Sequence, residues 1–509
     1  MKNRASGLFV LTLSVFLLSL FFDYQHILFY RPESIHFWRQ CDGASIALNY
    51  YQFDMNFFHP ELHCLLDGTH GYAVEECPIV YYLVALAYKT FGFHEFLFRL
   101  IVLLFFYTGV LFAYRLALLL LRNIWWSVLC ALTLFTFPVL VNYSPNFLPN
   151  VPAFAMDLTA LYLFFLAIET QRYRWFVAAV IVATLCGLLK ISSLLSFTVL
   201  LILFIAGLFQ KKRYWQLAFL YKKRWLSLLL LLLVPFLNLS WILWAKRYNQ
   251  LHHNALFLMD IVPVWKMPAS EIKMVAYKIL KDWIPFYASF PAVIVWAAMT
   301  GYILYFRRRC ERFLFHFYGL LLLGSGSYCL LFFGQLYVHD YYIICLYTFF
   351  LITAILFLHI LQKQHPTGFL HPLAKGTTAI FLVLGIIHSK QILSDKYYGI
   401  YKQAADQAFY DPGLSSYLNT LGINKNSVAI VLPDASPNGA LYLLNVKGQT
   451  NFPHPVQCDL WFNDPVNKNA AYLIVADSNY LHSGIRIPRR YTKMGQYKKT
   501  GVYRLLPGA

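Results

Sequence analysis

Residues 36 to 76 hold the side chains of this chain that are best suited to acid–base chemistry. The stretch begins His-Phe-Trp-Arg-Gln-Cys-Asp and ends Glu-Glu, whereas only 13% of all 509 residues are charged. A carboxylate can act as a general base, and the guanidinium fork of an arginine matches the geometry of a phosphate. We therefore expect Asp42 and Glu76 to be catalytic, and His36 and Arg39 to bind substrate.

Each of these residues also has a structural explanation. Arg39 and Asp42 are three residues apart, so they could form an ion pair beside an interfacial ring, that of Trp38. Glu76 lies two residues before Pro78 and could place a negative charge at the start of a helix. The sequence alone leaves these explanations open beside the catalytic one.

Three histidines in the same stretch raise the question of a metal site. Metal sites in proteins have recurrent ligand spacings, and the spacing of His59, His63 and His70 matches none of them. We therefore assign no metal ligand here. The sequence leaves the cofactor open, a divalent cation included.

Two further segments carry polar side chains next to apolar runs. Lys190 interrupts an apolar stretch, where a lysine is costly unless it has a partner or snorkels to the interface. His339, Asp340 and Tyr341 follow another apolar run. Tyrosine is common at membrane interfaces, but this does not explain the adjacent histidine and aspartate. We expect all four residues to bind substrate, and snorkelling is the alternative for Lys190.

The composition is that of a polytopic membrane protein. The chain is 59% hydrophobic, against about 45–50% for soluble proteins. Its 42 Lys and Arg residues outnumber 23 Asp and Glu residues, which gives a formal charge of +19. Because these cations lie in short loops between apolar runs, they indicate cytoplasmic loops and not a nucleic-acid-binding surface. We expect membrane lipids as partners and no nucleic acid.

Apolar runs of about 20 residues, the length that crosses a bilayer, predict about eleven transmembrane helices. The loop at 25–96 contains three basic and eight acidic residues, so we expect it on the outer face. Within it, the apolar segment 78–92 is assigned to the membrane interface, because a span there would move the later basic loops outside. The expected spans are 6–24, 97–120, 124–142, 151–168, 175–189, 192–209, 225–244, 285–306, 314–336, 343–361 and 373–388.

Near residue 391 the composition changes to that of a soluble domain. Strand patterns alternate with helical patterns from there on, which predicts a small α/β domain. We expect a transmembrane domain over residues 1–390 and an extracytoplasmic domain over residues 391–509. The expected helices are 412–421 and 437–445, and the expected strands are 427–432, 471–475 and 502–506.

Four of the nine cysteines fall on the expected outer, oxidising face. They are Cys41, Cys64, Cys77 and Cys458. A disulfide among them is compatible with this location, but the sequence does not determine the pairing.

Five short motifs follow one another along the chain. They are Trp-Arg-Gln-x-Asp at 38–42, Glu-x-Pro-Ile-x-Tyr at 76–81, Phe-Gly-x-x-Glu-x-x-x-Arg at 91–99, Pro-Asn-x-x-Pro at 145–149, and His-Asp-Tyr-Tyr at 339–342. In this order they resemble the GT-C glycosyltransferases, in particular the bacterial relatives of protein O-mannosyltransferases and of the lipid A aminoarabinose transferase. The similarity covers roughly residues 1–360.

This resemblance implies a GT-C membrane fold and transfer of a sugar, with inversion, from a polyprenyl-phosphate donor to an acceptor hydroxyl. The acceptor would be a glycan, a lipid or a protein on the outer face of the cell inner (plasma) membrane. The acidic residue of the family's first outer loop corresponds to Asp42. Relatives often carry another acidic residue where this chain has Asn150, and Asp157 lies deeper. That departure puts a second catalytic or metal-binding carboxylate at this turn in doubt.

Two other functional classes share some of these features. A transporter or flippase would also have many spans, but it more often shows matched charged or broken segments in mid-membrane. A polysaccharide polymerase or ligase would use a large later outer loop instead of the first one. We therefore favour sugar transfer, which requires Asp42, Lys190 and His339 to share one extracytoplasmic pocket.

Overall fold

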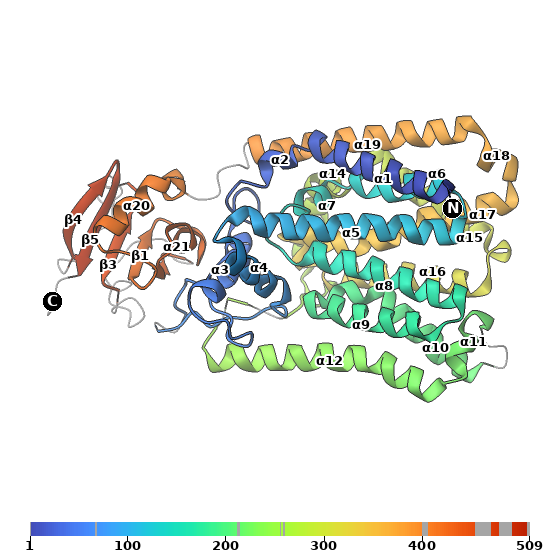
Figure 1. Ribbon diagram of the computed structural model, residues 1–509, viewed down its shortest axis with the longest axis horizontal. Helices are drawn as coiled ribbons and strands as arrows, with labels where there is room; N and C mark the ends of the chain where they lie inside the picture. Colours follow the sequence, from blue (N-terminus) through green and yellow to red (C-terminus); the bar gives the residue numbers. More distant parts are fainter. Residues whose placement is uncertain are drawn as a thin grey trace. The chain divides into compact units, whose positions relative to one another are not determined.

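The computed structural model describes residues 2–66, 69–210, 214–254, 256–257, 260–399, 406–452, 470–477 and 491–505 (Figure 1). The chain forms two compact units, each built from separate parts of the sequence. The first, which we call the helical unit, comprises Met1–Leu28, Arg99–Ile242 and Asp260–Ser394; the second, the loop–sheet unit, comprises Phe29–Phe98, Leu243–Met259 and Asp395–Ala509.

Long apolar helices make up the helical unit. Among the described residues, seven helices are long and apolar enough to cross a membrane, or eight if a bent pair counts as one span. The expected spans at 6–24, 124–142 and 175–189 correspond to shorter apolar helices. The elements that begin in the helical unit or enter it are α1 (Lys2–Phe21), α2 (Tyr24–Ile27), α5 (Glu95–Leu121), α6 (Ile124–Leu132), α7 (Pro138–Tyr143), α8 (Asn150–Thr170), α9 (Tyr173–Leu189), α10 (Leu195–Phe209), α11 (Ala218–Tyr221), α12 (Arg224–Leu251), α13 (Ala269–Lys278), α14 (Ile284–Tyr287), α15 (Phe290–Tyr305), α16 (Arg312–Leu331), α17 (Tyr347–Gln364), α18 (Pro366–Leu370) and α19 (Pro372–Tyr398).

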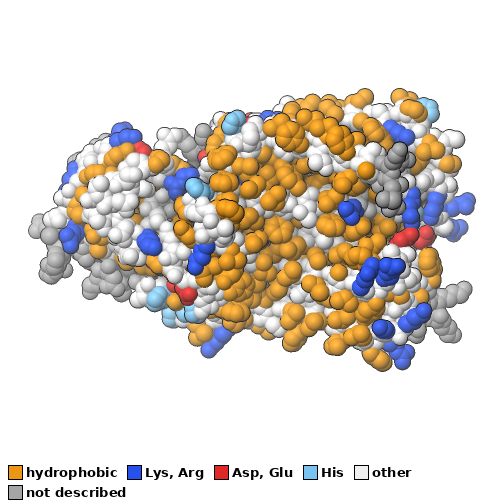
Figure 2. All heavy atoms as spheres, viewed as in Figure 1, with side chains coloured by type: hydrophobic (Ala, Val, Ile, Leu, Met, Phe, Trp, Pro, Cys, Tyr) orange, Lys and Arg blue, Asp and Glu red, His pale blue; other side chains and the backbone are white. Residues whose placement is uncertain are grey.

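The surface of the helical unit is that of a protein in lipid. Figure 2 shows hydrophobic side chains covering most of its visible face. On α12, Leu229 and Phe236 are each 64% exposed, although both are large and apolar. Water would disfavour such a surface, whereas lipid tails solvate it. The chain is therefore a multi-pass membrane protein.

One expected span, 285–306, differs from the structure. The helical segments Ala269–Tyr287 and Phe290–Tyr305 meet at an angle of 91°. Ala288 and Ser289, which separate the two helical segments, have an extended backbone. Pro291 lies in the first turn of α15, and because proline has no backbone N–H it cannot donate the hydrogen bond that would continue the preceding helix. The apolar run is continuous in sequence, so hydropathy alone did not reveal the break.

The loop–sheet unit contains two helices of the loop at 25–96, α3 (Phe37–Gln52) and α4 (Ile79–Phe91). The 13 residues of α4 extend about 20 Å, which is shorter than the roughly 30 Å of a bilayer core. This length agrees with the interfacial assignment of 78–92. The α3 helix carries two of the candidate residues, Arg39 and Asp42.

A five-stranded sheet with the order β2-β1-β3-β5-β4 forms the remainder of the loop–sheet unit. The first three strands are parallel, and β5 joins β3 and β4 in antiparallel pairing. The expected strands and helices are present, whereas β2 and β4 were not expected. The elements are α20 (Pro412–Thr420), β1 (Val428–Leu432), α21 (Gly439–Leu444), β2 (Lys447–Thr450), β3 (Tyr472–Val475), β4 (Tyr491–Tyr497) and β5 (Thr500–Leu505).

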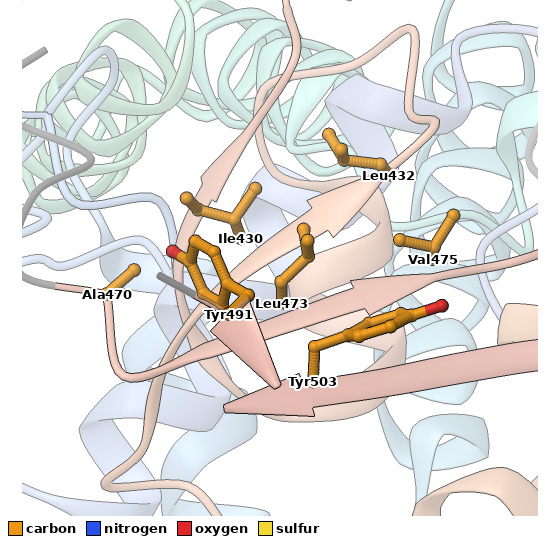
Figure 3. Packing of buried hydrophobic residues seen from close by; sticks show 7 residues of the cluster. All are labelled: Ile430, Leu432, Ala470, Leu473, Val475, Tyr491 and Tyr503. Carbon is orange, nitrogen blue, oxygen red and sulfur yellow. The ribbon is translucent and has the colours of Figure 1, made fainter. Parts of the chain in front are cut away.

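One face of the sheet has its own apolar core. Alternate residues of β1 and β3 point to this face, because side chains alternate along a strand, and two tyrosines from β4 and β5 cover them (Figure 3). The confirmed fold is thus a helical membrane protein with a small α/β domain; the boundary at residue 390 stays a prediction. The core residues are Ile430, Leu432, Ala470, Leu473, Val475, Tyr491 and Tyr503.

Candidate functional site

Helix α3 places Arg39 and Asp42 on one face, because residues three apart are neighbours on a helix. Its start is sharply defined: His36, the residue before the helix, has a left-handed backbone with φ of 56°. Such a conformation is uncommon for a residue other than glycine. His36 itself is half-buried, and its side chain makes no capping hydrogen bond to the helix.

Arg39 pairs with two glutamates from the end of the same loop. Its Nη2 atom lies 2.5 Å from Glu76 Oε1 and 3.0 Å from Glu75 Oε2. The hydroxyl of Tyr81 on α4 lies 3.4 Å from both Arg39 Nη2 and Glu76 Oε1. The fold of the loop therefore brings Arg39, near its start, to the two glutamates near its end. The positive charge of Arg39 offsets part of the negative charge of these carboxylates. From the sequence, Glu75 was not a candidate, and Tyr81 appeared only within the 76–81 motif.

Asp42 is buried, with 7% of its surface exposed. Its Oδ1 atom accepts a hydrogen bond from Asn438 Nδ2 at 3.3 Å, so its partner comes from the C-terminal domain. Burial raises the pKa of Asp42 to about 7; the Arg39 guanidinium opposes this rise, and the charge of Glu75 adds to it. A carboxyl group with this pKa can exchange a proton near neutral pH.

The other four predicted binding residues lie in the helical unit. Lys190 follows α9, and its Nζ atom lies 5.4 Å from the ring centre of Tyr342. The ring of His339 stacks on that of Tyr342 at 5.0 Å with an 18° angle, and its Nδ1 atom lies 3.2 Å from Tyr341 Oη. A lysine and a histidine thus both contact the ring of Tyr342, and the charge of the lysine can attract an anionic group there.

Asp340 has a different environment from its neighbours. It is fully buried, and its Oδ1 atom accepts a hydrogen bond from Tyr143 Oη at 2.7 Å. Tyr143 lies on α7, and its ring also contacts Tyr341 at 5.6 Å. Asp340 therefore anchors its motif to α7, while His339 remains partly exposed.

The three histidines of the loop at 25–96 have two kinds of surroundings. His63 is buried between Ser45 Oγ and Asn445 Oδ1, and burial lowers its pKa to about 4. His59 and His70 each contact the ring of Tyr72. In the part of the chain that the structure describes, no group of three or more His, Cys, Asp or Glu side chains could hold a metal ion.

Of the four outer cysteines, Cys41, Cys64 and Cys77 are described, and each has a free thiol. Burial raises the pKa of Cys64 and of Cys77 to about 12, so both are protonated at neutral pH. Cys458 lies outside the described residues.

The structure therefore shows two groups of predicted residues. Asp42, Arg39 and Glu76 belong to the loop–sheet unit, whereas Lys190 and His339 belong to the helical unit. Whether the two groups act on one substrate stays a prediction.

Comparisons with known proteins find a family model that matches part of the sequence and solved structures with a similar fold. Residues 75–244 match the family model of dolichyl-phosphate-mannose-protein mannosyltransferases. The structure is similar to that of ArnT from Cupriavidus metallidurans bound to undecaprenyl phosphate, with a TM-score of 0.61, 12% identity and 98% of each chain covered. It is also similar to the apo state of that protein, with a TM-score of 0.58, 12% identity and 98% of each chain covered.

A third solved structure resembles the chain more distantly. The Archaeoglobus fulgidus oligosaccharyltransferase, solved in complex with Zn and sulfate, has a TM-score of 0.51 at 12% identity. The match covers 94% of this chain and 70% of the archaeal one. No curated protein sequence matches the chain.

Proposed function

From the GT-C glycosyltransferase fold of this chain, we propose that it transfers a sugar from a polyprenyl-phosphate donor to an acceptor hydroxyl. The observation that carries the proposal is Asp42: a buried carboxyl group on the first outer loop, with a pKa of about 7, beside the Arg39–Glu76 pair. A general base works best when its pKa lies near the working pH. The acceptor would be a glycan, a lipid or a protein.

In this proposal Asp42 accepts the proton of the acceptor hydroxyl. The hydroxyl oxygen then forms a bond to the anomeric carbon of the sugar, and the bond between that carbon and the phosphate oxygen breaks. Attack opposite the leaving group inverts the anomeric configuration. The leaving group is polyprenyl phosphate, which carries away the electron pair of the broken bond. General-base assistance of this kind contributes about 10²–10⁴ in rate.

The leaving phosphate needs cationic partners. Lys190 is the first candidate, because it lies at a helix end in the helical unit, beside the tyrosine ring that also stacks on His339. Positive charge placed where negative charge develops is among the strongest contributions to catalysis. Undecaprenyl phosphate in the structure of the Cupriavidus metallidurans protein supports a donor of this chemical class.

Arg39 and Glu76 act together in this proposal. The Arg39 guanidinium favours the ionised form of Asp42, and Glu76 holds the guanidinium in place. Substrate phosphate would bind Arg39 in competition with the two glutamates. Tyr341 would orient His339 through the contact of its hydroxyl with the imidazole. Asp340 would hold the same segment in place through its hydrogen bond to Tyr143 on α7.

The proposed location is the cell inner (plasma) membrane, with the C-terminal domain on the extracytoplasmic side. The excess of acidic residues in the loop at 25–96 and the basic residues of the short loops support this orientation.

Consumption of a labelled donor tests the proposed function. The purified protein in lipid nanodiscs is incubated with a radiolabelled polyprenyl-phosphate sugar and a membrane extract as acceptor source. Transfer of label to a new product, with release of polyprenyl phosphate, is the expected result. Consumption of a polyprenyl-diphosphate oligosaccharide instead would indicate a polymerase or ligase. Movement of the intact donor across the bilayer of sealed proteoliposomes, without cleavage, would indicate a flippase.

A further inference from the structure

We infer that Asn438, in the C-terminal domain, is a positioning residue for Asp42, so that this domain is part of the catalytic unit. The inference rests on the proposed function, because it concerns the residue assigned there as the base. It assigns a role to a domain whose sequence carries no catalytic motif.

The hydrogen bonds of Asn438 fix the orientation of its side-chain amide. Its Oδ1 atom accepts from the backbone N–H groups of His63 at 3.1 Å and Cys64 at 3.0 Å. These two groups can only donate, so the amide oxygen must face them. The NH₂ group then faces the opposite side, where it donates to Cys41 O at 3.4 Å and to Asp42 Oδ1 at 3.3 Å.

A tight turn holds Asn438 in this position. The carboxylate of Asp434 accepts hydrogen bonds from the backbone N–H and Oγ of Ser436, both at 2.8 Å, and from the N–H of Ala440 at 2.6 Å. Ser436 Oγ in turn accepts from the N–H of Gly439 at 2.9 Å. Asn438 itself is fully buried, so its bonds are shielded from water.

Close packing brings this turn against α3. A side chain at Gly439 would lie 2.2 Å from the ring of Phe37, so the two elements can approach only because position 439 has no Cβ atom. Phe37 is the first residue of α3. Because Gly439 permits this close approach, the side-chain amide of the preceding residue, Asn438, reaches Asp42 on α3.

The consequence is electrostatic. A donor that points at a carboxylate stabilises its charged form, and the bond from Asn438 lowers the pKa of Asp42 against the effect of burial. The other groups that act on this carboxylate are Arg39, which also favours ionisation, and Glu75 and Glu76, which oppose it. Loss of the Asn438 donor should therefore leave less ionised base at a given pH.

The test compares two asparagines of the same helix region in full-length protein. Asn438→Asp keeps the shape and the acceptor oxygen but can place a second carboxylate beside Asp42. Asn445→Asp adds the same charge at the other end of α21, where the side chain contacts His63 Nε2 instead of Asp42. If the aspartate variant does not fold, Asn438→Ser replaces it in the test. The shorter serine side chain lacks the NH₂ group that donates to Asp42, and it adds no charge.

The pH profile of kcat/KM is the first readout. We expect Asn438→Asp to move the acidic limb upward by about one pH unit or more, with the plateau at high pH largely retained, since a like charge at this distance shifts a pKa by about 1–3. Asn438→Ser should move the limb in the same direction, and Asn445→Asp should leave it in place. A folded Asn438 variant with a lower plateau and an unmoved limb would overturn the inference.

A second readout does not depend on transfer. Labelling of Asp42 by a carbodiimide, followed by peptide mass spectrometry across pH, reports its protonation directly. If the protein transfers no sugar but the labelling curve shifts upward in Asn438→Asp, the positioning contact stands and the proposed function fails. If transfer is normal and neither curve shifts, the positioning role is wrong and the proposed function stands.

Discussion

The Arg39 guanidinium lies 2.5 Å from the carboxylate of Glu76, and both side chains are buried in the loop–sheet unit. The pair joins the start and the end of a loop that spans 37 positions between the two residues. The guanidinium of Arg39, which Glu76 holds in position, also places a positive charge near Asp42. The loop thus forms a structured site and not an open connection between helices.

Removal of Arg39 should destabilise this site more than removal of an exposed arginine. Arg39→Gln removes the cation that pairs with the buried Glu76 and the half-buried Glu75, and loss of one partner of a buried pair costs about 3–5 kcal/mol. Arg122→Gln breaks an ion pair with Glu169 whose side chains are 59% and 47% exposed, so its cost should be below about 1 kcal/mol. Thermal unfolding of both variants in the same detergent measures the difference. Equal unfolding midpoints would show that the buried pair does not hold the loop.

The activity should have an acidic limb near neutral pH. The pKa of Asp42 is about 7, so the ionised base is lost as pH falls through that value. We expect kcat/KM to fall about tenfold for each pH unit below 6, where Asp42 is mostly protonated. A pH titration of transfer with saturating divalent cation and constant ionic strength measures this. A rate that is unchanged down to pH 5 would exclude Asp42 as the base.

The same carboxyl group should couple stability to pH. Its ordinary pKa is 3.8 and its folded value is about 7, so the folded state holds more protons than the unfolded state between these values. The contribution of Asp42 to the free energy of unfolding therefore falls as pH rises through this window. Asp42→Asn cannot ionise, so its unfolding midpoint relative to wild type should rise from pH 4 to pH 7 and then level off. The exposed substitution Glu271→Gln serves as control, and a pH-independent difference for Asp42→Asn would contradict the expectation.

Lys190 should contribute to donor affinity. Lys190→Met removes the cation beside Tyr342, and loss of a charged contact to phosphate should weaken binding of polyprenyl phosphate about 10- to 100-fold. Lys190→Arg should retain most of the affinity, because its charge remains. Lys273→Met, at an exposed lysine on α13, is the matched control. Unchanged affinity in Lys190→Met would favour the snorkelling explanation for this residue.

Several elements could be predicted from the sequence because their signals are local. Apolar runs identified the membrane helices, and the motif at 76–81 marked the start of α4. The strands at 428–432 and 472–475 were evident because buried parallel strands are continuously apolar. By contrast, β2 has the sequence Lys-Gly-Gln-Thr and β4 is mostly polar, so neither has an apolar pattern.

Contacts between distant parts of the chain could not be predicted in this way. The sequence suggested Asp42 as the partner of Arg39, since the two are three residues apart, but Arg39 reaches Glu75 and Glu76 through the fold of the loop. Asn438 directly precedes α21. Its side chain nevertheless bonds to residues nearly 400 positions earlier, a relationship for which a single sequence carries no signal.

The most direct measurement for the whole account is single-turnover transfer by Asp42→Asn. The variant keeps the size of the side chain and can still contact Asn438, but it cannot accept a proton. The experiment uses labelled polyprenyl-phosphate sugar with purified variant and wild-type protein in nanodiscs. A cooperative unfolding transition of each protein above the assay temperature shows that it is folded. The account predicts a rate about 10²–10⁴ lower than wild type with donor binding retained. Transfer near the wild-type rate in folded protein would contradict it.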